Sequence, residues 1–177
     1  MRALVIYESM FGNTEAIARA VAEGIAYHLE VEALEVGSAP GTIPSDVVLF
    51  AVGGPTHAHG MTTPRTRADA RRHADRLVSA GGGVREWVGT VEASGPIAAA
   101  AFDTRIKGPA LLWGSAARGL ARELVRAGLR LALPPRSFLV EGPTGPLTDR
   151  LVEGELDRAR DWGRELAASI RLPTSIG

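Results

Sequence analysis

Near its N-terminus the sequence changes abruptly from strand-like to helix-like, and this change limits the folds that the chain can adopt. Residues 4–7 are apolar and suit a β-strand, whereas Ile17, Val21 and Ile25 recur at intervals of four, as on one face of a helix. The short loop between them has the sequence Ser9-Met10-Phe11-Gly12-Asn13-Thr14. A strand, a short loop and a helix in this order direct backbone N–H groups and the positive end of the helix dipole towards one point. We therefore interpret residues 9–14 as a phosphate-binding loop.

This loop differs from two well-known phosphate-binding motifs and resembles a third. It has neither the lysine of a P-loop nor the glycine spacing of a dinucleotide-binding loop. It resembles the first loop of the flavodoxin family, Ser/Thr-x-Thr-Gly-x-Thr, which wraps the phosphate of FMN. Ser9, Gly12 and Thr14 match that pattern, whereas Phe11 replaces a threonine, as an aromatic residue does in the Ser-Met-Tyr-Gly run of flavodoxin-like quinone reductases. An ordinary β–α turn with a glycine and a threonine cap remains the alternative.

The composition limits the partners that the protein could have. The chain carries 20 basic and 20 acidic side chains, so nothing indicates nucleic acid or an anionic membrane surface as a partner. The absence of cysteine excludes disulfides, thiol catalysis and thiolate metal sites. No apolar run reaches the roughly 18 residues of a membrane span, and the first residues predict a strand rather than a signal peptide. These absences lead us to expect a cytoplasmic protein without membrane insertion. We expect a single domain over residues 1–177, because 45% hydrophobic residues suffice for one core.

Strand-like and helix-like segments alternate along the whole chain. The predicted strands are residues 4–7, 31–36, 47–52, 96–102 and 137–140. The predicted helices after the first are residues 65–78, a short turn within 84–91, 115–127 and about 147–170. The second strand alternates apolar and acidic residues, as at a sheet edge, whereas the third is apolar throughout, as in a central strand. This alternation predicts an α/β fold with three layers (αβα) around a five-stranded parallel sheet.

The order of the strands is not determined by the alternation alone. A dinucleotide-binding order and the flavodoxin-like order 2-1-3-4-5 both fit, and both place a ligand at the carboxyl ends of the strands. The resemblance to flavodoxins implies the order 2-1-3-4-5. That order would bring the loops after the first and third strands together.

Two predicted helices have distinctive faces. The helix at 65–78 has a thin apolar stripe and is otherwise rich in charge: Arg67, Arg71, Arg72 and Arg76 with Asp69 and Asp75. We interpret it as a solvated helix, and a docking face for an acidic redox partner is the alternative. In the last helix, one side carries the residues that we expect to face the core: Val152, Leu156, Ala159, Leu166 and Ile170.

A second loop, at residues 53–60, resembles the Gly-x-Pro-Thr loop that borders the flavin ring in flavodoxin-like proteins. The resemblance implies a cofactor-binding role for Pro55, Thr56, His57, Ala58, His59 and Gly60. An imidazole could stack on the flavin ring or donate to its edge. Two histidines at this spacing could also suggest a metal, but the loop has no acidic residue and the chain has no cysteine, so we predict no metal site. Exposed histidines without a role are the other alternative.

A third loop, at residues 101–109, resembles the stretch that forms the far wall of the flavin pocket in short flavodoxin-family proteins. The residues that the resemblance assigns to the cofactor are Phe102, Asp103, Thr104, Arg105 and Gly108. Asp103 and Thr104 could bond the pyrimidine edge of the flavin, or Asp103 could cap the turn. Arg105 or Lys107 near that edge would stabilise a reduced, anionic flavin. The loop has no stacking tyrosine, and Trp113 lies some way along the chain.

The resemblance extends over nearly the whole chain and implies an FMN-binding protein that transfers electrons to or from a redox partner protein, without a side chain acting as acid or base. An FMN-dependent NAD(P)H:quinone oxidoreductase is the alternative, with a small quinone and a nicotinamide as substrates and His57 or His59 orienting the substrate. A third interpretation is a flavodoxin-like module that has lost flavin and serves in binding or regulation. The sequence has no Ser-His-Asp arrangement or paired carboxylates that would indicate a hydrolase or a transferase.

Overall fold

The computed structural model describes residues 1–57, 60–72, 78–93, 95, 97–109, 114–142 and 150–170. Its centre is a parallel sheet whose main strands are β1 (Arg2–Tyr7), β2 (Glu30–Glu35), β4 (Val47–His57), β7 (Ala98–Ile106) and β9 (Arg136–Val140). These strands follow the order β2-β1-β4-β7-β9. The short β8 (Arg130–Leu131) also pairs with β7, ahead of β9. The predicted order 2-1-3-4-5 is therefore confirmed.

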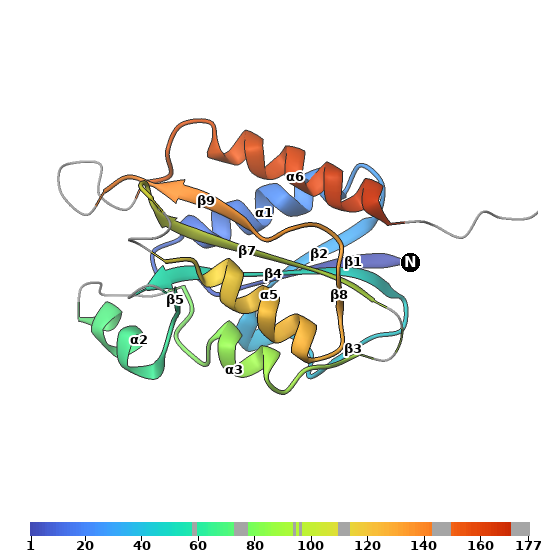
Figure 1. The fold of residues 1–177 in the computed structure, drawn as a ribbon, viewed down its shortest axis with the longest axis horizontal. Coiled ribbons are helices and arrows are strands. Elements are labelled where there is room, and N and C mark those ends of the chain that lie inside the picture. The colour runs from blue at the N-terminus through green and yellow to red at the C-terminus, as the bar shows by residue number, and fades with distance from the viewer. Residues whose placement is uncertain are drawn as a thin grey trace, which may run out of the picture.

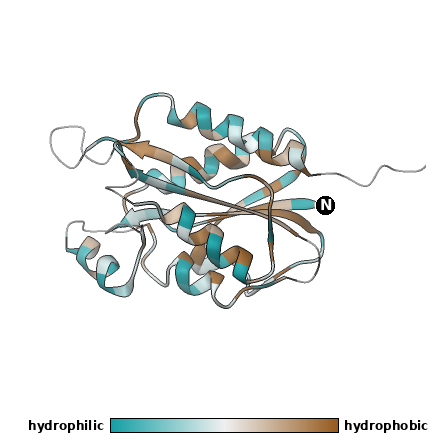
Figure 2. Ribbon diagram, viewed as in Figure 1, coloured by the Kyte–Doolittle hydropathy of each residue, from teal (hydrophilic) through white to brown (hydrophobic). Residues whose placement is uncertain are grey.

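Helices cover both faces of the sheet (Figure 1). On one face lie α1 (Asn13–Ile25) and α6 (Glu155–Ser169), and on the other lie α3 (Val84–Val88) and α5 (Ala116–Arg126). Alternate residues of each strand enter the two cores, as Val5 packs with α1 and α6 while Ile6 packs with α3 and α5. Figure 2 shows the consequence, a sheet with predominantly hydrophobic central strands between helices whose outer faces are hydrophilic. This is the predicted αβα arrangement.

The packing of α1 against α6 depends on two glycines. A Cβ atom at Gly24 would overlap the carbonyl oxygen of Arg160, and one at Gly163 would overlap the carbonyl oxygen of Val21. The two glycine Cα atoms therefore lie where the helix backbones approach most closely. Beneath α6, Trp162 packs edge-on against Phe102 and Phe138, with ring centroids 6.0 Å apart in both pairs.

The last helix begins later than the sequence predicts, at Glu155. Leu151 pairs with Val140, and the N–H of Val152 donates to the carbonyl of Leu139, so this segment lies beside β9 in an extended conformation. Residues 143–149, where the helix was expected to start, lie outside the described part of the chain. The prediction that Leu156 faces the core is wrong, because its exposed fraction is 37%.

Two central strands extend beyond their predicted ends. β4 continues to His57 and β7 to Ile106, because residues 53–55 pair in parallel with residues 102–104. Much of the second and third predicted loops is therefore strand, which is a correction to the sequence-based boundaries. Besides β8, short strands that were not predicted are β5 (Gly60–Met61), antiparallel to β4, and the separate pair β3 (Thr42–Ile43) and β6 (Glu92–Ala93). A 3₁₀ helix, η1 (Val36–Ser38), follows β2.

The predicted helix at 65–78 corresponds to α2 (Pro64–Arg71), and residues 73–77 lie outside the described part of the chain. Thr63 caps α2, since its hydroxyl accepts the N–H of Thr66, and Pro64 occupies the first helical position. The interpretation of α2 as fully solvated is wrong at Arg67, whose side chain is only 7% exposed. In the part of the chain that the structure describes, no helix combines the length and the apolar character needed to cross a membrane.

Candidate ligand-binding cleft

A cleft of about 240 Å³ lies at the carboxyl ends of β1, β4 and β7. Ten of the predicted site residues line it: Ser9, Met10, Phe11, Asn13, Thr14, Pro55, Thr56, His57, Thr104 and Arg105. Ile106 and Val140, which were not predicted, complete the lining. The fold therefore brings residues from all three predicted loops into one concave site.

Gly12 shapes the first loop and opens α1 towards the cleft. Its φ of 94° lies in the left-handed region, which glycine adopts without strain. Its N–H donates to Ser9 Oγ at 3.1 Å, and its carbonyl accepts the N–H of Ala16 at 2.9 Å. Gly12 is the N-cap residue but has no side chain to cap the N–H groups of the first helical turn, which have no acceptor within the helix. These groups and the helix dipole make this side of the cleft attractive to an anion.

Hydroxyl groups join the first and third loops inside the cleft. Thr14 Oγ1 and Thr104 Oγ1 lie 2.7 Å apart, and both residues are buried while lining the cleft. Whichever hydroxyl accepts this hydrogen bond keeps its own proton for a ligand. The bond also holds the start of α1 against the end of β7, so the two walls keep a fixed separation.

Arg105 supplies positive charge to the cleft. One terminal nitrogen, Nη1, donates to the carbonyl oxygens of Ile106 at 3.2 Å and Gly108 at 2.7 Å. The Nε atom is buried and has no hydrogen-bond partner among the described residues. No carboxylate lines the cleft among those residues, so nothing there neutralises the guanidinium. An anionic ligand would therefore gain from Arg105 and from the start of α1 together.

Asp103 lies behind the cleft rather than in its lining, and it anchors α5. Its Oδ2 accepts the hydroxyl of Ser115 at 2.7 Å, the N–H of Ala117 at 2.8 Å and the hydroxyl of Thr56 at 3.0 Å. The Thr56 hydroxyl in turn accepts the N–H of Ala116 at 2.8 Å. These contacts join Asp103 to the start of α5 rather than to its own turn, and its contact with a flavin stays a prediction. They also connect the start of α5 to the floor of the cleft.

The remaining predicted site residues have different positions. Phe102 is fully buried in the core, and Gly60 pairs with His57 in the β4–β5 hairpin without lining the cleft. Gly108 contributes its carbonyl to the Arg105 side chain. Phe11 lines the cleft and is 42% exposed, so an aromatic ring is available at its mouth. Ala58, His59 and Trp113 lie outside the described residues.

The described residues also bear on two expectations for the site, the absence of a metal and the presence of a cation near the ligand. They include no group of three or more histidine, aspartate or glutamate side chains that could hold a metal ion. Lys107, which was considered as a partner for the flavin edge, is exposed and does not line the cleft. Of the two cations considered for that role, Arg105 is the one that the fold places in the lining.

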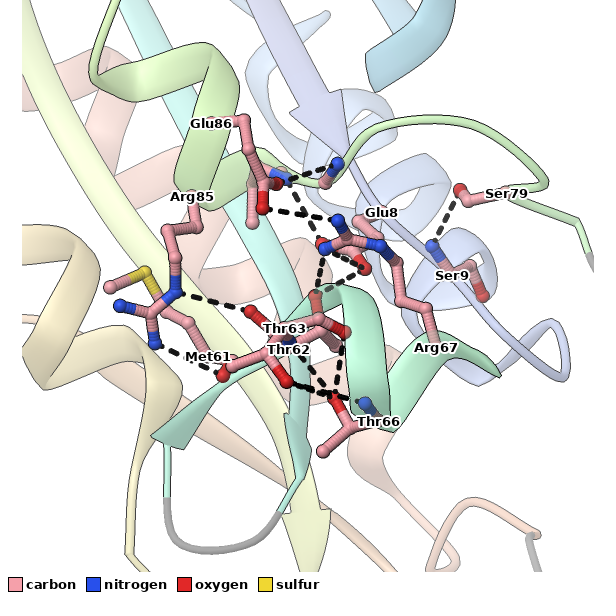
Figure 3. A network of polar contacts seen from close by, with 12 residues as sticks. Glu8, Ser9, Met61, Thr62, Thr63, Thr66, Arg67, Ser79, Arg85 and Glu86 are labelled. Carbon is pink, nitrogen blue, oxygen red and sulfur yellow. Dashed lines mark hydrogen bonds and ion pairs between the residues drawn. The ribbon is translucent and has the colours of Figure 1, made fainter. Parts of the chain in front are cut away.

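An ionic cluster centred on the buried Glu8 lies behind the first loop and was not found from the sequence (Figure 3). We call Glu8, Thr62, Arg67, Val84 and Glu86 the Glu8 cluster. The fully buried Glu8 carboxylate accepts the hydroxyl of Thr62 at 2.5 Å and the N–H of Val84 at 3.0 Å. Arg67 lies 3.9 Å from Glu8, and it donates to Thr62 and to Glu86, each at 3.0 Å. The cluster thereby joins the end of β1 to the starts of α2 and α3.

Burial and ion pairing act in opposite directions in this cluster. Burial raises the pKa of Glu8 above the ordinary glutamate value, and the hydrogen bonds from Thr62 and Val84 and the charge of Arg67 reduce this effect without cancelling it. Burial also acts to raise the pKa of Glu86. There the hydrogen bonds from Arg67 and from the backbone outweigh burial, so the pKa of Glu86 is lowered.

The sequence held a usable signal for some of the missed residues. Ile106 and Val140 are paired at the carboxyl ends of β7 and β9, where the rule for ligands in parallel sheets places a site. No local pattern marks Glu8 or Arg67 as partners, because they lie on different elements and meet only in the folded chain.

Comparison with known proteins supports the fold independently of the cleft. No protein-family profile and no curated protein matches the sequence. Among solved structures, the Streptococcus pneumonia TIGR4 flavodoxin aligns with a TM-score of 0.64 and 18% identity over 96% of this chain and 100% of that protein. Oxidised flavodoxin 2 from Bacillus cereus gives the same values. A flavodoxin from the domain Archaea aligns with a TM-score of 0.60 and 19% identity over 95% of this chain and 97% of its own. From its strand order and these likenesses, we conclude that the chain has a flavodoxin-like fold.

Proposed function

We propose that the cleft binds FMN and that the protein transfers electrons through it to or from a redox partner protein. The observation that carries the proposal is a cleft at the start of α1 whose described lining includes Arg105 and no carboxylate. The flavodoxin-like fold supports the same ligand class. When bound, FMN would supply reversible electron transfer at its ring, while the chain would bind and orient it.

The described residues fit the two chemical parts of FMN. Residues 9–14 would hold the phosphate, because they combine hydroxyl groups with the start of α1, where the helix dipole favours an anion. Residues 55–57 and 104–105 would border the ring, with Arg105 as the positively charged residue beside it. Apolar contacts for the ring are available from Phe11, Ile106 and Val140.

The first test is an anaerobic titration of the purified protein with FMN, followed by flavin fluorescence. We expect saturable quenching with one FMN per chain, because close contact with the side chains that border the ring opens a non-radiative path for its excited state. Riboflavin, which lacks the phosphate, should bind more weakly if residues 9–14 hold that group. A protein that quenches neither flavin would contradict the proposal and would leave a flavin-free binding module.

A second candidate function is an FMN-dependent NAD(P)H:quinone oxidoreductase. The observation that favours it is His57, which is half-buried and lines the cleft. An imidazole there could orient a quinone or a nicotinamide beside the flavin. Addition of NADPH and then benzoquinone to the FMN-loaded protein separates the two candidates. Rapid bleaching by NADPH and recovery with quinone favour the reductase, whereas reduction only through a separate reductase favours the electron carrier.

A further inference from the structure

The first loop is held from behind by a two-residue segment that follows α2. We call the contacts between Ser9-Met10 and Val78-Ser79 the Ser79 bridge. The N–H of Ser9 donates to Ser79 Oγ at 3.0 Å, and the N–H of Ser79 donates back to the carbonyl of Ser9 at 2.8 Å. The N–H of Val78 donates to the carbonyl of Met10 at 3.2 Å. Ser79 is 1% exposed, so the Ser9 N–H has no access to water as a replacement acceptor.

The Glu8 cluster holds the residue that precedes this loop. Glu8 donates its own N–H to the carbonyl of Gly53 at 2.9 Å, while its carboxylate binds Thr62 and Val84 as described above. In Figure 3 the two sets of contacts lie side by side, with Ser9 bonded to Ser79 next to Glu8 within the cluster. The loop is therefore fixed at its first residues by contacts from two separate parts of the α2–α3 region.

Close packing leaves little freedom at these contacts. A Cβ atom at Gly54 would lie 2.9 Å from a methyl group of Val84, and one at Gly83 would overlap the guanidinium of Arg67. Met10 is 2% exposed and packs against Ala70 of α2. A close-packed interior of this kind transmits a change at one residue to its neighbours.

The residues behind the loop do not line the cleft. Of the Glu8 cluster and the Ser79 bridge, the structure places only Ser9 and Met10 in the described lining. Glu8, Arg67 and Ser79 therefore make no contact with a ligand in the cleft, and they can position it only through the loop that they hold. A loop that is already ordered loses less conformational entropy on binding than a mobile one does.

We propose that the Ser79 bridge and the Glu8 cluster preorganise residues 9–14 for the phosphate group of the ligand, so that Ser79 and Glu8 are positioning residues for phosphate recognition. The inference rests on the proposed function, because it assigns one part of FMN to this loop. It adds that affinity for the phosphate is set partly by the α2–α3 region, outside the cleft.

The experiment compares FMN with riboflavin, because the two flavins share a ring and differ in the phosphate. In Ser79→Ala the Ser9 N–H loses its acceptor, and we expect the Kd for FMN to rise by about tenfold while that for riboflavin changes by less than about twofold. Glu8→Gln is the second variant, which keeps the shape of the side chain but removes its charge opposite Arg67. Glu8→Gln should also raise the ratio of the Kd for FMN to the Kd for riboflavin.

Leu124→Ala is the control, since Leu124 is buried in α5 and does not line the cleft. Urea unfolding gives the free energy of unfolding of each variant, so that flavin binding can be compared between variants of similar stability. If Ser79→Ala and Glu8→Gln weaken both flavins equally, as Leu124→Ala should, or weaken neither, the positioning role is overturned. A wild-type protein that binds neither flavin overturns the proposed function and this inference with it. If the wild type binds FMN but the ratio of the two Kd values is unchanged in both variants, the inference is overturned and the proposed function stands.

Discussion

At the scale of single residues, the fold separates charged side chains that are neighbours in sequence. Arg105 lines the cleft with a buried Nε, whereas Lys107, two residues later, is exposed outside it. Of these two cations, Arg105 is therefore the one placed to act on a ligand in the cleft. A positive charge beside a flavin ring stabilises the reduced, anionic form relative to the oxidised form.

We predict that Arg105→Gln lowers the midpoint potential of FMN bound to the protein. The expected change is about 30 mV for the two-electron couple, which corresponds to about 1.4 kcal/mol of lost charge stabilisation. Equilibration with reference dyes measures the potential. Lys107→Gln is the matched control and should change it much less. Equal shifts in the two variants would show that long-range charge acts on the flavin and that the position of Arg105 does not.

At the scale of elements, the contact between α1 and α6 depends on the absence of side chains. Gly24 and Gly163 let the helices approach until a Cβ at either position would overlap the backbone of the other helix. A backbone carbonyl cannot move aside as a flexible side chain can. Gly119 in α5 provides the contrast, since its Cβ would lie 3.2 Å from the terminal methyl of Met61.

We predict that Gly163→Ala lowers the free energy of unfolding, because overpacking a close-packed contact usually costs about 1–3 kcal/mol. This cost exceeds the gain of up to about 1 kcal/mol that alanine brings to a helix interior. Gly119→Ala, the helical control, should be neutral or slightly stabilising because the Met61 side chain can move. Urea unfolding monitored by circular dichroism measures both variants. A Gly163→Ala protein as stable as the wild type would mean that α1 and α6 are not packed this closely.

At the scale of the whole molecule, stability depends on a charge buried far from solvent. The Glu8 carboxylate is enclosed by β1, α2 and α3, with Arg67 and Glu86 as the charged groups that face it. Its raised pKa means that the folded protein holds this proton more tightly than the unfolded chain does. The resulting stabilisation is complete below the ordinary glutamate pKa and is lost as the pH rises through the folded value.

We predict that the stability difference between wild type and Glu8→Gln becomes less favourable to the wild type as the pH rises from about 4 to about 8. Each unit by which the pKa is raised corresponds to about 1.4 kcal/mol across that window. Urea unfolding of the ligand-free proteins at a series of pH values measures the difference. The charge of Glu86 is one of the causes that raise the pKa of Glu8, so Glu86→Gln should make this trend shallower. A difference that grows with pH would contradict the raised pKa.

Much of the architecture and the location of the cleft follow from local sequence patterns. Apolar runs and helical spacing define the five main strands and the helices that alternate with them, because each segment must bury one face or both. Polar and glycine-containing segments at the carboxyl ends of three strands indicate where a ligand site lies. The strand order needed the resemblance to flavodoxins in addition. Ten of the predicted site residues line the observed cleft, and their role in binding FMN stays a prediction.

Tertiary structure alone decided the roles of particular side chains. Asp103 anchors α5, Arg67 is buried between Glu8 and Glu86, and residues 151–152 extend along β9 before α6 begins. In each case the deciding contact comes from a different element of the fold. Local propensity reports how a segment can bury its own surface, whereas a hydrogen bond or a charge pair depends on the partner that folding brings near. The sequence by itself therefore determined the layers and the end of the sheet where a ligand can bind. The folded chain determined which side chains face that ligand and which support them from behind.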